Sequence, residues 1–135
     1  MAIAILGSTS AIGREIAGVL VGQGHELLLF ARNPPDESTR RLDVLDFDEG
    51  IFRADLASMG RLDGVILCVG YLGDNEKAFS DPEEHARIMD TNYTGSARAL
   101  DVASEMMEGG YICALSSVAA PGAVLIPGES AFVRP

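Results

Sequence analysis

The sequence predicts an α/β fold with a doubly wound parallel sheet. Strand-length apolar runs alternate with segments whose apolar residues recur at helical spacing, and the first run has no polar face. Such alternation is typical of parallel strands joined by right-handed crossovers, with helices on both faces of the sheet. Because 47% of the 135 residues are hydrophobic and 22% are charged, we expect one folded domain rather than a disordered chain.

The first elements are a strand, a helix and a second strand. The apolar run Ala2–Leu6 predicts a central strand. Helical spacing of the next apolar residues predicts a helix that stops at residues 22–24, which read Gly-Gln-Gly. A second apolar run at residues 26–30 predicts the second strand, and two consecutive prolines soon after it break the pattern.

The middle of the chain continues the alternation. The polar segment at residues 36–41 is too short for a crossover helix, so we expect a loop or a single turn there. A brief third strand is expected at residues 42–44, and apolar side chains on one side of residues 48–59 predict a helix. The run at residues 64–70 predicts the fourth strand.

A long helix and a fifth strand follow. Ser80 or Asp81 is the expected N-cap, Pro82 takes the first helical position, and the helix ends at two glycines, residues 109–110. The strand is expected at residues 111–115. The predicted buried stripe of this helix consists of Met89, Tyr93, Leu100 and Met107.

Residues 119–135 do not fit the pattern. They contain three prolines and two glycines, and we expect an irregular tail after a domain that spans residues 1–118. A doubly wound sheet should continue with a helix at this point. The predicted sheet is therefore incomplete, with about five strands, and its C-terminal strands and helices are missing.

The turn between the first strand and the first helix is the strongest indication of function. It consists of Gly7, Ser8, Thr9, Ser10, Ala11, Ile12 and Gly13. Backbone N–H groups at a helix N-terminus point at an anion, and the aligned peptide dipoles favour negative charge there. Gly7 permits the tight turn, while Gly13 lets the helix approach the sheet or lets a diphosphate approach the chain. Any α/β protein can contain such a turn, but the strand before it and the helix after it favour a nucleotide site.

Further candidates lie where other strands end, because open α/β sheets bind ligands at the carboxyl edge. Arg32 follows the second strand and could accommodate the 2′-phosphate of NADP, which favours NADP(H) over NAD(H); the alternative is a solvated loop arginine. Asp43 could accept a hydrogen bond from the adenine amine while Val44 packs on the ring, or it could be an ordinary aspartate at a strand end. Gly70 would let the nicotinamide ribose lie near the backbone.

Two polar residues are candidates for the chemistry itself. Ser117 ends the fifth strand at the same edge, and its hydroxyl could bond a substrate carbonyl. Asn92 stands in the middle of the long helix, a poor position by propensity. It is either an indifferent surface residue or a polar group that holds water near the site.

Charge and composition exclude several classes of partner. The net charge of −10 repels phosphate backbones, so we expect no nucleic acid partner. The apolar runs are of strand length, which predicts neither a signal peptide nor a membrane span, and the expected location is the cytoplasm. Cys68 and Cys113 fall in strand-like runs and are expected to be small buried residues. His25 and His85 lack ligand spacing, so we expect no metal site.

Together these residues resemble the short-chain dehydrogenase/reductase family. The motifs that carry the resemblance are residues 7–13, 42–44, 68–70, 92–95 and 115–119. The resemblance implies a Rossmann fold and hydride transfer between a nicotinamide dinucleotide and a carbonyl or alcohol, with Ser117 orienting the carbonyl and Asn92 holding a water. Residues 70–74 and 92–95 are similar to the branch that reduces the 2-keto intermediate of decaprenylphosphoryl-ribose epimerisation. The substrate is then a small-molecule or lipid-linked sugar carbonyl.

The chain departs from the family in the acid/base pair. In that family a tyrosine is the general acid/base and a lysine lowers its pKa, a dozen or so residues after the serine. No tyrosine follows Tyr111, and Lys77 is the only lysine. Ser130 and Arg134 have the right mutual spacing, but a serine hydroxyl is a far weaker acid than a phenol. We therefore expect negligible turnover.

Three explanations of the missing acid/base pair remain open. The chain is a fragment of a longer reductase, its gene has lost the reading frame near Ala119, or it is a non-catalytic nucleotide-binding remnant. The alternative function is a nucleotide-binding or regulatory module that pairs with another subunit. The fifth strand and the long helix would leave apolar surface uncovered, which predicts association, including a possible homo-oligomer, or low solubility.

Overall fold

The computed structural model describes residues 1–115 in full and the backbone of residues 123–124 and 132–133. Five parallel strands form one sheet in the order β3-β2-β1-β4-β5. Their bounds are β1 Ala2–Leu6, β2 Glu26–Ala31, β3 Thr39–Arg41, β4 Gly64–Leu67 and β5 Tyr111–Ala114. The order reverses between β1 and β4, so the predicted α/β fold and doubly wound sheet are confirmed.

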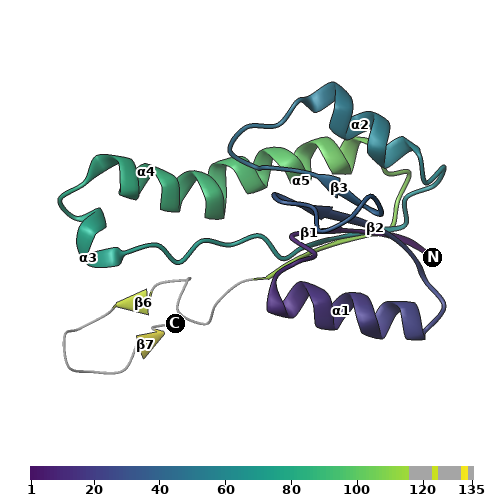
Figure 1. The fold of residues 1–135 in the computed structure, drawn as a ribbon, viewed down its shortest axis with the longest axis horizontal. Coiled ribbons are helices and arrows are strands. Elements are labelled where there is room, and N and C mark those ends of the chain that lie inside the picture. Colours follow the sequence, from purple (N-terminus) through teal and green to yellow (C-terminus); the bar gives the residue numbers. More distant parts are fainter. Residues whose placement is uncertain (116–122, 125–131, 134–135) are drawn as a thin grey trace.

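Helices cover both faces of the sheet (Figure 1). Helix α1 (Ala11–Gly22) packs on one face, where its apolar side chains meet Ile3, Ile5 and Ile66. On the other face, α2 (Glu49–Ala57) and α5 (Gly95–Glu105) enclose the larger core around Phe30 and Phe52. The ring of Phe52 packs edge-on against Phe30, with 5.2 Å between the ring centroids.

The third strand lies earlier than the sequence predicts. The pairing of β3 with β2 ends at Leu42, whose N–H donates to the carbonyl of Ala31. The chain then turns, because the carboxylate of Asp43 accepts from the N–H of Leu45 at 3.0 Å. Leu42 and Val44 are apolar because the core buries them beside the sheet, and not because they belong to a strand.

The long helix is interrupted. It consists of α4 (Pro82–Met89), a π-helical turn η1 (Asp90–Thr94) and α5, and Asp81 is its N-cap. The predicted stripe is wrong in its first half, because Met89 and Tyr93 are 48% and 70% exposed. Leu100 and Met107 do pack against the core, but the helix ends at Glu105 rather than at residues 109–110, so Met107 lies beyond it. The π turn inserts one residue, so positions before it no longer share a face with positions after it.

Smaller differences concern segments expected to be loop or buried. A short helix, α3 (Asn75–Ala78), carries Lys77 where a loop is expected. The fourth strand ends at Leu67 rather than at residue 70. Cys68 is buried, and burial raises the pKa of its thiol, whereas Cys113 on β5 is exposed, contrary to the prediction.

The tail contributes two short antiparallel segments, β6 (Ala123–Val124) and β7 (Phe132–Val133), which the sequence does not predict. Across the part of the chain that the structure describes, no helix has the length and apolar character to cross a membrane.

Candidate functional site

The turn from β1 into α1 is tightly fixed to the neighbouring strands. Gly7 has a φ of +86°, and a Cβ on it would lie 2.8 Å from the backbone of Cys68 and of Val69. The carbonyl of Phe30, near the end of β2, accepts from the N–H groups of Gly7 and Ser8, each at 2.9 Å. It also accepts from the Ser8 hydroxyl at 3.1 Å. Ser8 is therefore committed to holding the turn in place.

Ser10 caps the helix. Its hydroxyl accepts from the N–H of Gly13 and donates to the carbonyl of Gly7, both at 3.0 Å. A Cβ on Gly13 would overlap the carbonyl oxygen of Gly7 and lie 2.9 Å from Ser10 Oγ. Gly13 therefore lets the first turn of α1 pack closely against the preceding turn.

Three backbone donors at this helix end are open. Within the described residues, no acceptor lies in hydrogen-bond reach of the N–H groups of Thr9, Ala11 and Ile12. They lie at the start of a 12-residue helix, where the peptide dipoles leave partial positive charge. The turn can therefore bind an anion through its backbone.

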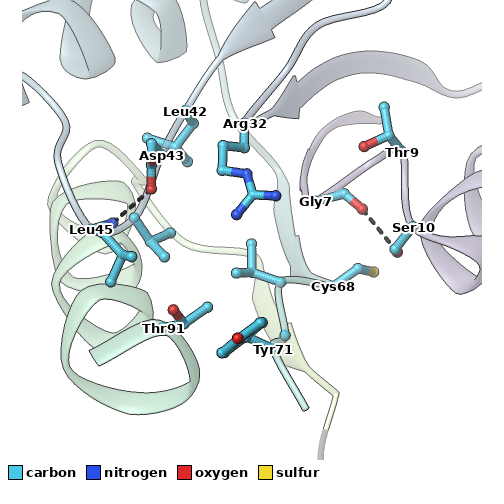
Figure 2. Close-up of a pocket in the computed structure, with 13 residues that line it drawn as sticks. Gly7, Thr9, Ser10, Arg32, Leu42, Asp43, Leu45, Cys68, Tyr71 and Thr91 are labelled. Carbon is cyan, nitrogen blue, oxygen red and sulfur yellow. Dashed lines mark hydrogen bonds between the residues drawn. The ribbon is translucent and has the colours of Figure 1, made fainter. Parts of the chain in front are cut away.

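A cavity of about 250 Å³ lies beside this turn, at the carboxyl ends of the strands (Figure 2). The residues after β1, β2, β3 and β4 all contribute to it, together with one residue of η1. They are Gly7, Thr9, Ser10, Arg32, Leu42, Asp43, Val44, Leu45, Cys68, Val69, Gly70, Tyr71 and Thr91.

Arg32 reaches into the middle of this cavity. Its side chain extends between Gly7 on one side and Asp43 on the other (Figure 2). Arg32 is exposed, and no ion pair or hydrogen bond within the described residues engages its guanidinium. The cavity thus combines backbone N–H donors with the long cationic side chain of Arg32, a combination suited to phosphate groups.

The wall beyond β4 is held by Asn92. Its side-chain amide accepts from the N–H of Tyr71 at 2.9 Å and donates to the carbonyl of Tyr71 at 2.7 Å. Both polar ends of Asn92 therefore fix protein backbone. The hydroxyl of Tyr71 donates to Glu84, and this bond, with burial, raises the pKa of Tyr71.

The structure brings most of the sequence-predicted residues to this cavity. Gly7, Thr9, Ser10, Arg32, Asp43, Val44 and Gly70 line it. Ser8, Ala11, Ile12 and Gly13 belong to the adjoining turn and helix start, and neither they nor Asn92 are lining residues. Ser117 falls outside the described residues. Sequence reasoning missed Tyr71 and Thr91; Tyr71 directly follows Gly70, but no local pattern marks Thr91.

The strand order, the glycine turn and the cavity at the carboxyl edge define a Rossmann-type α/β domain. The sequence model of the NAD dependent epimerase/dehydratase family matches residues 3–134. The chain belongs to the NAD dependent epimerase/dehydratase family. No curated protein matches it in sequence.

Solved structures with this fold include short-chain dehydrogenases/reductases, as the sequence motifs predict. One from Serratia marcescens has a TM-score of 0.70 and 20% identity, over 88% of this chain and 58% of that one. A short-chain type dehydrogenase/reductase from Mycobacterium ulcerans has a TM-score of 0.71 and 25% identity, over 88% and 52%. Aldohexose dehydrogenase from Thermoplasma acidophilum has a TM-score of 0.70 and 22% identity, over 89% and 50%. The chain thus spans between 50% and 58% of the length of these three structures.

Proposed function

We propose that the chain is the cofactor-binding part of an oxidoreductase and binds a nicotinamide dinucleotide in the cavity at the carboxyl ends of β1, β2 and β4. The observation that carries this proposal is the open N-terminus of α1 beside Arg32. The N–H groups of Thr9, Ala11 and Ile12 are free to donate to a diphosphate, which the helix dipole also favours. The family to which the chain belongs supports the same cofactor class.

The adenosine half belongs on the β2–β3 side of the turn. Arg32 extends there and would pair with a 2′-phosphate, which favours NADP(H) over NAD(H). Asp43 lines the same side and would accept from the adenine amine, and the buried Val44 would form the apolar wall against the ring.

The nicotinamide half then belongs on the β4 side. Gly70 lines the cavity there, and among the described residues a Cβ on it would meet only Asn92 Oδ1, at an ordinary 3.6 Å. Packing against the residues that the structure describes therefore does not require a glycine at this position, which supports a role in admitting the ribose.

The bound nicotinamide supplies or accepts the hydride of a carbonyl–alcohol interconversion. Ser117 would orient the substrate carbonyl, and Asn92 would serve the site by holding the backbone of Tyr71 in place. The sequence provides no tyrosine after Tyr111 and no lysine besides Lys77, so we expect negligible turnover by this chain alone. The decaprenylphosphoryl-ribose branch, a lipid-linked sugar substrate, self-association and a cytoplasmic location remain predictions.

Calorimetric titration with NADPH and then NADH tests the cofactor. We expect saturable binding of both, with NADPH tighter. Arg32→Ala should weaken NADPH binding by about 10- to 100-fold, the value of one charge-assisted hydrogen bond, and leave NADH binding unchanged. Arg61→Ala is the control, because Arg61 precedes β4 at the opposite end of the strands.

Each negative outcome has a distinct meaning. Failure of the unmodified chain to bind either dinucleotide would refute the proposed function. Equal loss of NADPH and NADH binding in Arg32→Ala would refute the 2′-phosphate contact alone. NADPH oxidation with small carbonyls that Ser117→Ala abolishes would show that the chain is active after all.

A further inference from the structure

Glu84 is a buried carboxylate far from the core of the sheet. It lies in the first turn of α4, which extends beyond the sheet in Figure 1, and it is only 8% exposed. Its Oε1 accepts from the hydroxyl of Tyr71 at 3.0 Å and from the N–H of Asp74 at 2.8 Å. Burial of a carboxylate is costly unless such bonds compensate it, and the helix N-terminus adds favourable charge. One atom of α4 thus joins both ends of the segment from Tyr71 to Asp74.

Three other contacts hold the same segment. Asn92 engages both backbone groups of Tyr71, and the guanidinium of Arg87 lies over its ring, 4.4 Å from the centroid. Gly73 has a φ of +64°, and a Cβ on it would lie 2.7 Å from Glu84 Oε1. The segment is therefore held to α4 and η1 at Tyr71 and Asp74 and packs closely at Gly73, whereas Leu72 is exposed. Glu84 is central to these contacts.

Tyr71 connects this clamp to the cavity. Its side chain lines the cavity next to Gly70 and Thr91, and Figure 2 shows it across the cavity from Arg32. The strand order places β4 on the opposite side of β1 from β2, so this wall faces away from the adenosine side.

We propose that Glu84 is a positioning residue which, by clamping Tyr71 and Asp74 onto α4, sets the cavity wall against which the nicotinamide half of the dinucleotide binds. This inference rests on the proposed function. It predicts that loss of the clamp affects the nicotinamide half of the ligand and spares the adenosine half.

The test compares two ligands by calorimetry on the full chain. NADPH spans the whole cavity, whereas adenosine 2′,5′-bisphosphate lacks the second phosphate, its ribose and the nicotinamide. Glu84→Ala should weaken NADPH binding by about tenfold and leave binding of the bisphosphate unchanged. Glu84→Gln keeps an oxygen that can accept from Tyr71 and Asp74, and should restore most of the affinity.

Glu83→Ala is the matched control, because Glu83 is the exposed neighbour of Glu84 in the same helical turn, and it should bind both ligands normally. Tyr71→Phe removes one bond of the clamp and keeps the ring, so it tests the inference if Glu84→Ala does not fold; we expect a smaller, NADPH-selective loss. Equal weakening of both ligands, or no change in either, would overturn the role of Glu84. An unmodified chain that binds the bisphosphate and not NADPH would also overturn it, whereas one that binds neither refutes the proposed function itself.

Discussion

Replacement of Gly7 by alanine tests whether the turn between β1 and α1 is as tightly constrained as its geometry indicates. The residue has a φ of +86°, and the left-handed conformation costs an L-residue about 1–2 kcal/mol. The new Cβ would lie 2.8 Å from backbone atoms of Cys68 and Val69, which cannot rotate away as a side chain can. Such overpacking adds about 1–3 kcal/mol, so we expect Gly7→Ala to lower the free energy of unfolding by about 2–5 kcal/mol.

Thermal unfolding followed by circular dichroism measures this loss. With about 4 °C per kcal/mol for a domain of this size, the melting temperature should fall by about 8–20 °C. Gly18→Ala is the control, because Gly18 lies in the exposed middle of α1 and a Cβ there would meet no atom of the described residues within 4 Å. That substitution should stabilise the chain by about 0.5–1 kcal/mol. Similar melting temperatures for the two variants would refute the constraint on Gly7.

Three further substitutions probe the core, a pH-dependent contact and a close helix approach. Phe52→Ala empties a position that is 2% exposed, and should cost about 3–5 kcal/mol in urea unfolding; less than 1 kcal/mol would contradict its place in the core. The N–H of Ala2 donates to Asp63, which, with Arg61 nearby, lowers the pKa of that carboxyl. The Asp63 carboxylate therefore stabilises the fold fully above the ordinary pKa of an aspartate, and this stabilisation is lost as the pH falls through the lowered pKa. Asp63→Asn should make the free energy of unfolding less dependent on pH in the acid range. An unchanged pH dependence would argue against this contact. A Cβ on Gly95 would overlap the carbonyl of Val44, so Gly95→Ala should destabilise the chain by about 1–3 kcal/mol, whereas a melting temperature at or above that of the unmodified chain would show that the loop yields.

Most of the sheet could be predicted because its central strands are buried on both faces. The run Ala2–Leu6 has five buried residues in succession, a pattern that few other structures produce. The edge strand β3 could not be found in this way. Its residues, Thr39, Arg40 and Arg41, include two exposed arginines, which an edge strand tolerates because one side meets solvent.

The candidate site was predictable where chain direction alone places a residue. Arg32 and Gly70 follow strands, and parallel strands bring their carboxyl ends to one edge. Glu84 could not be recognised, because residues 83 and 84 are two adjacent acids in a first helical turn and read alike. Only the fold of the segment around Gly73 decides which of the two carboxylates is buried.

The π turn η1 between α4 and α5 makes the number of residues in this long helix important for the site. The sheet core determines which side of α5 faces inward, while the Tyr71–Asp74 segment determines which side of α4 faces the loop. A regular helix would not face both of these surfaces. The extra residue in η1 rotates α4 by about 100° relative to α5, so that each half of the helix faces its own partner. A deletion of one residue other than Asn92 within Asp90–Thr94 would restore a regular helix and carry Glu84 away from its partners, although every side chain of the clamp would still be present. The number of residues between Glu84 and Gly95 is therefore as much a part of the site as their identities.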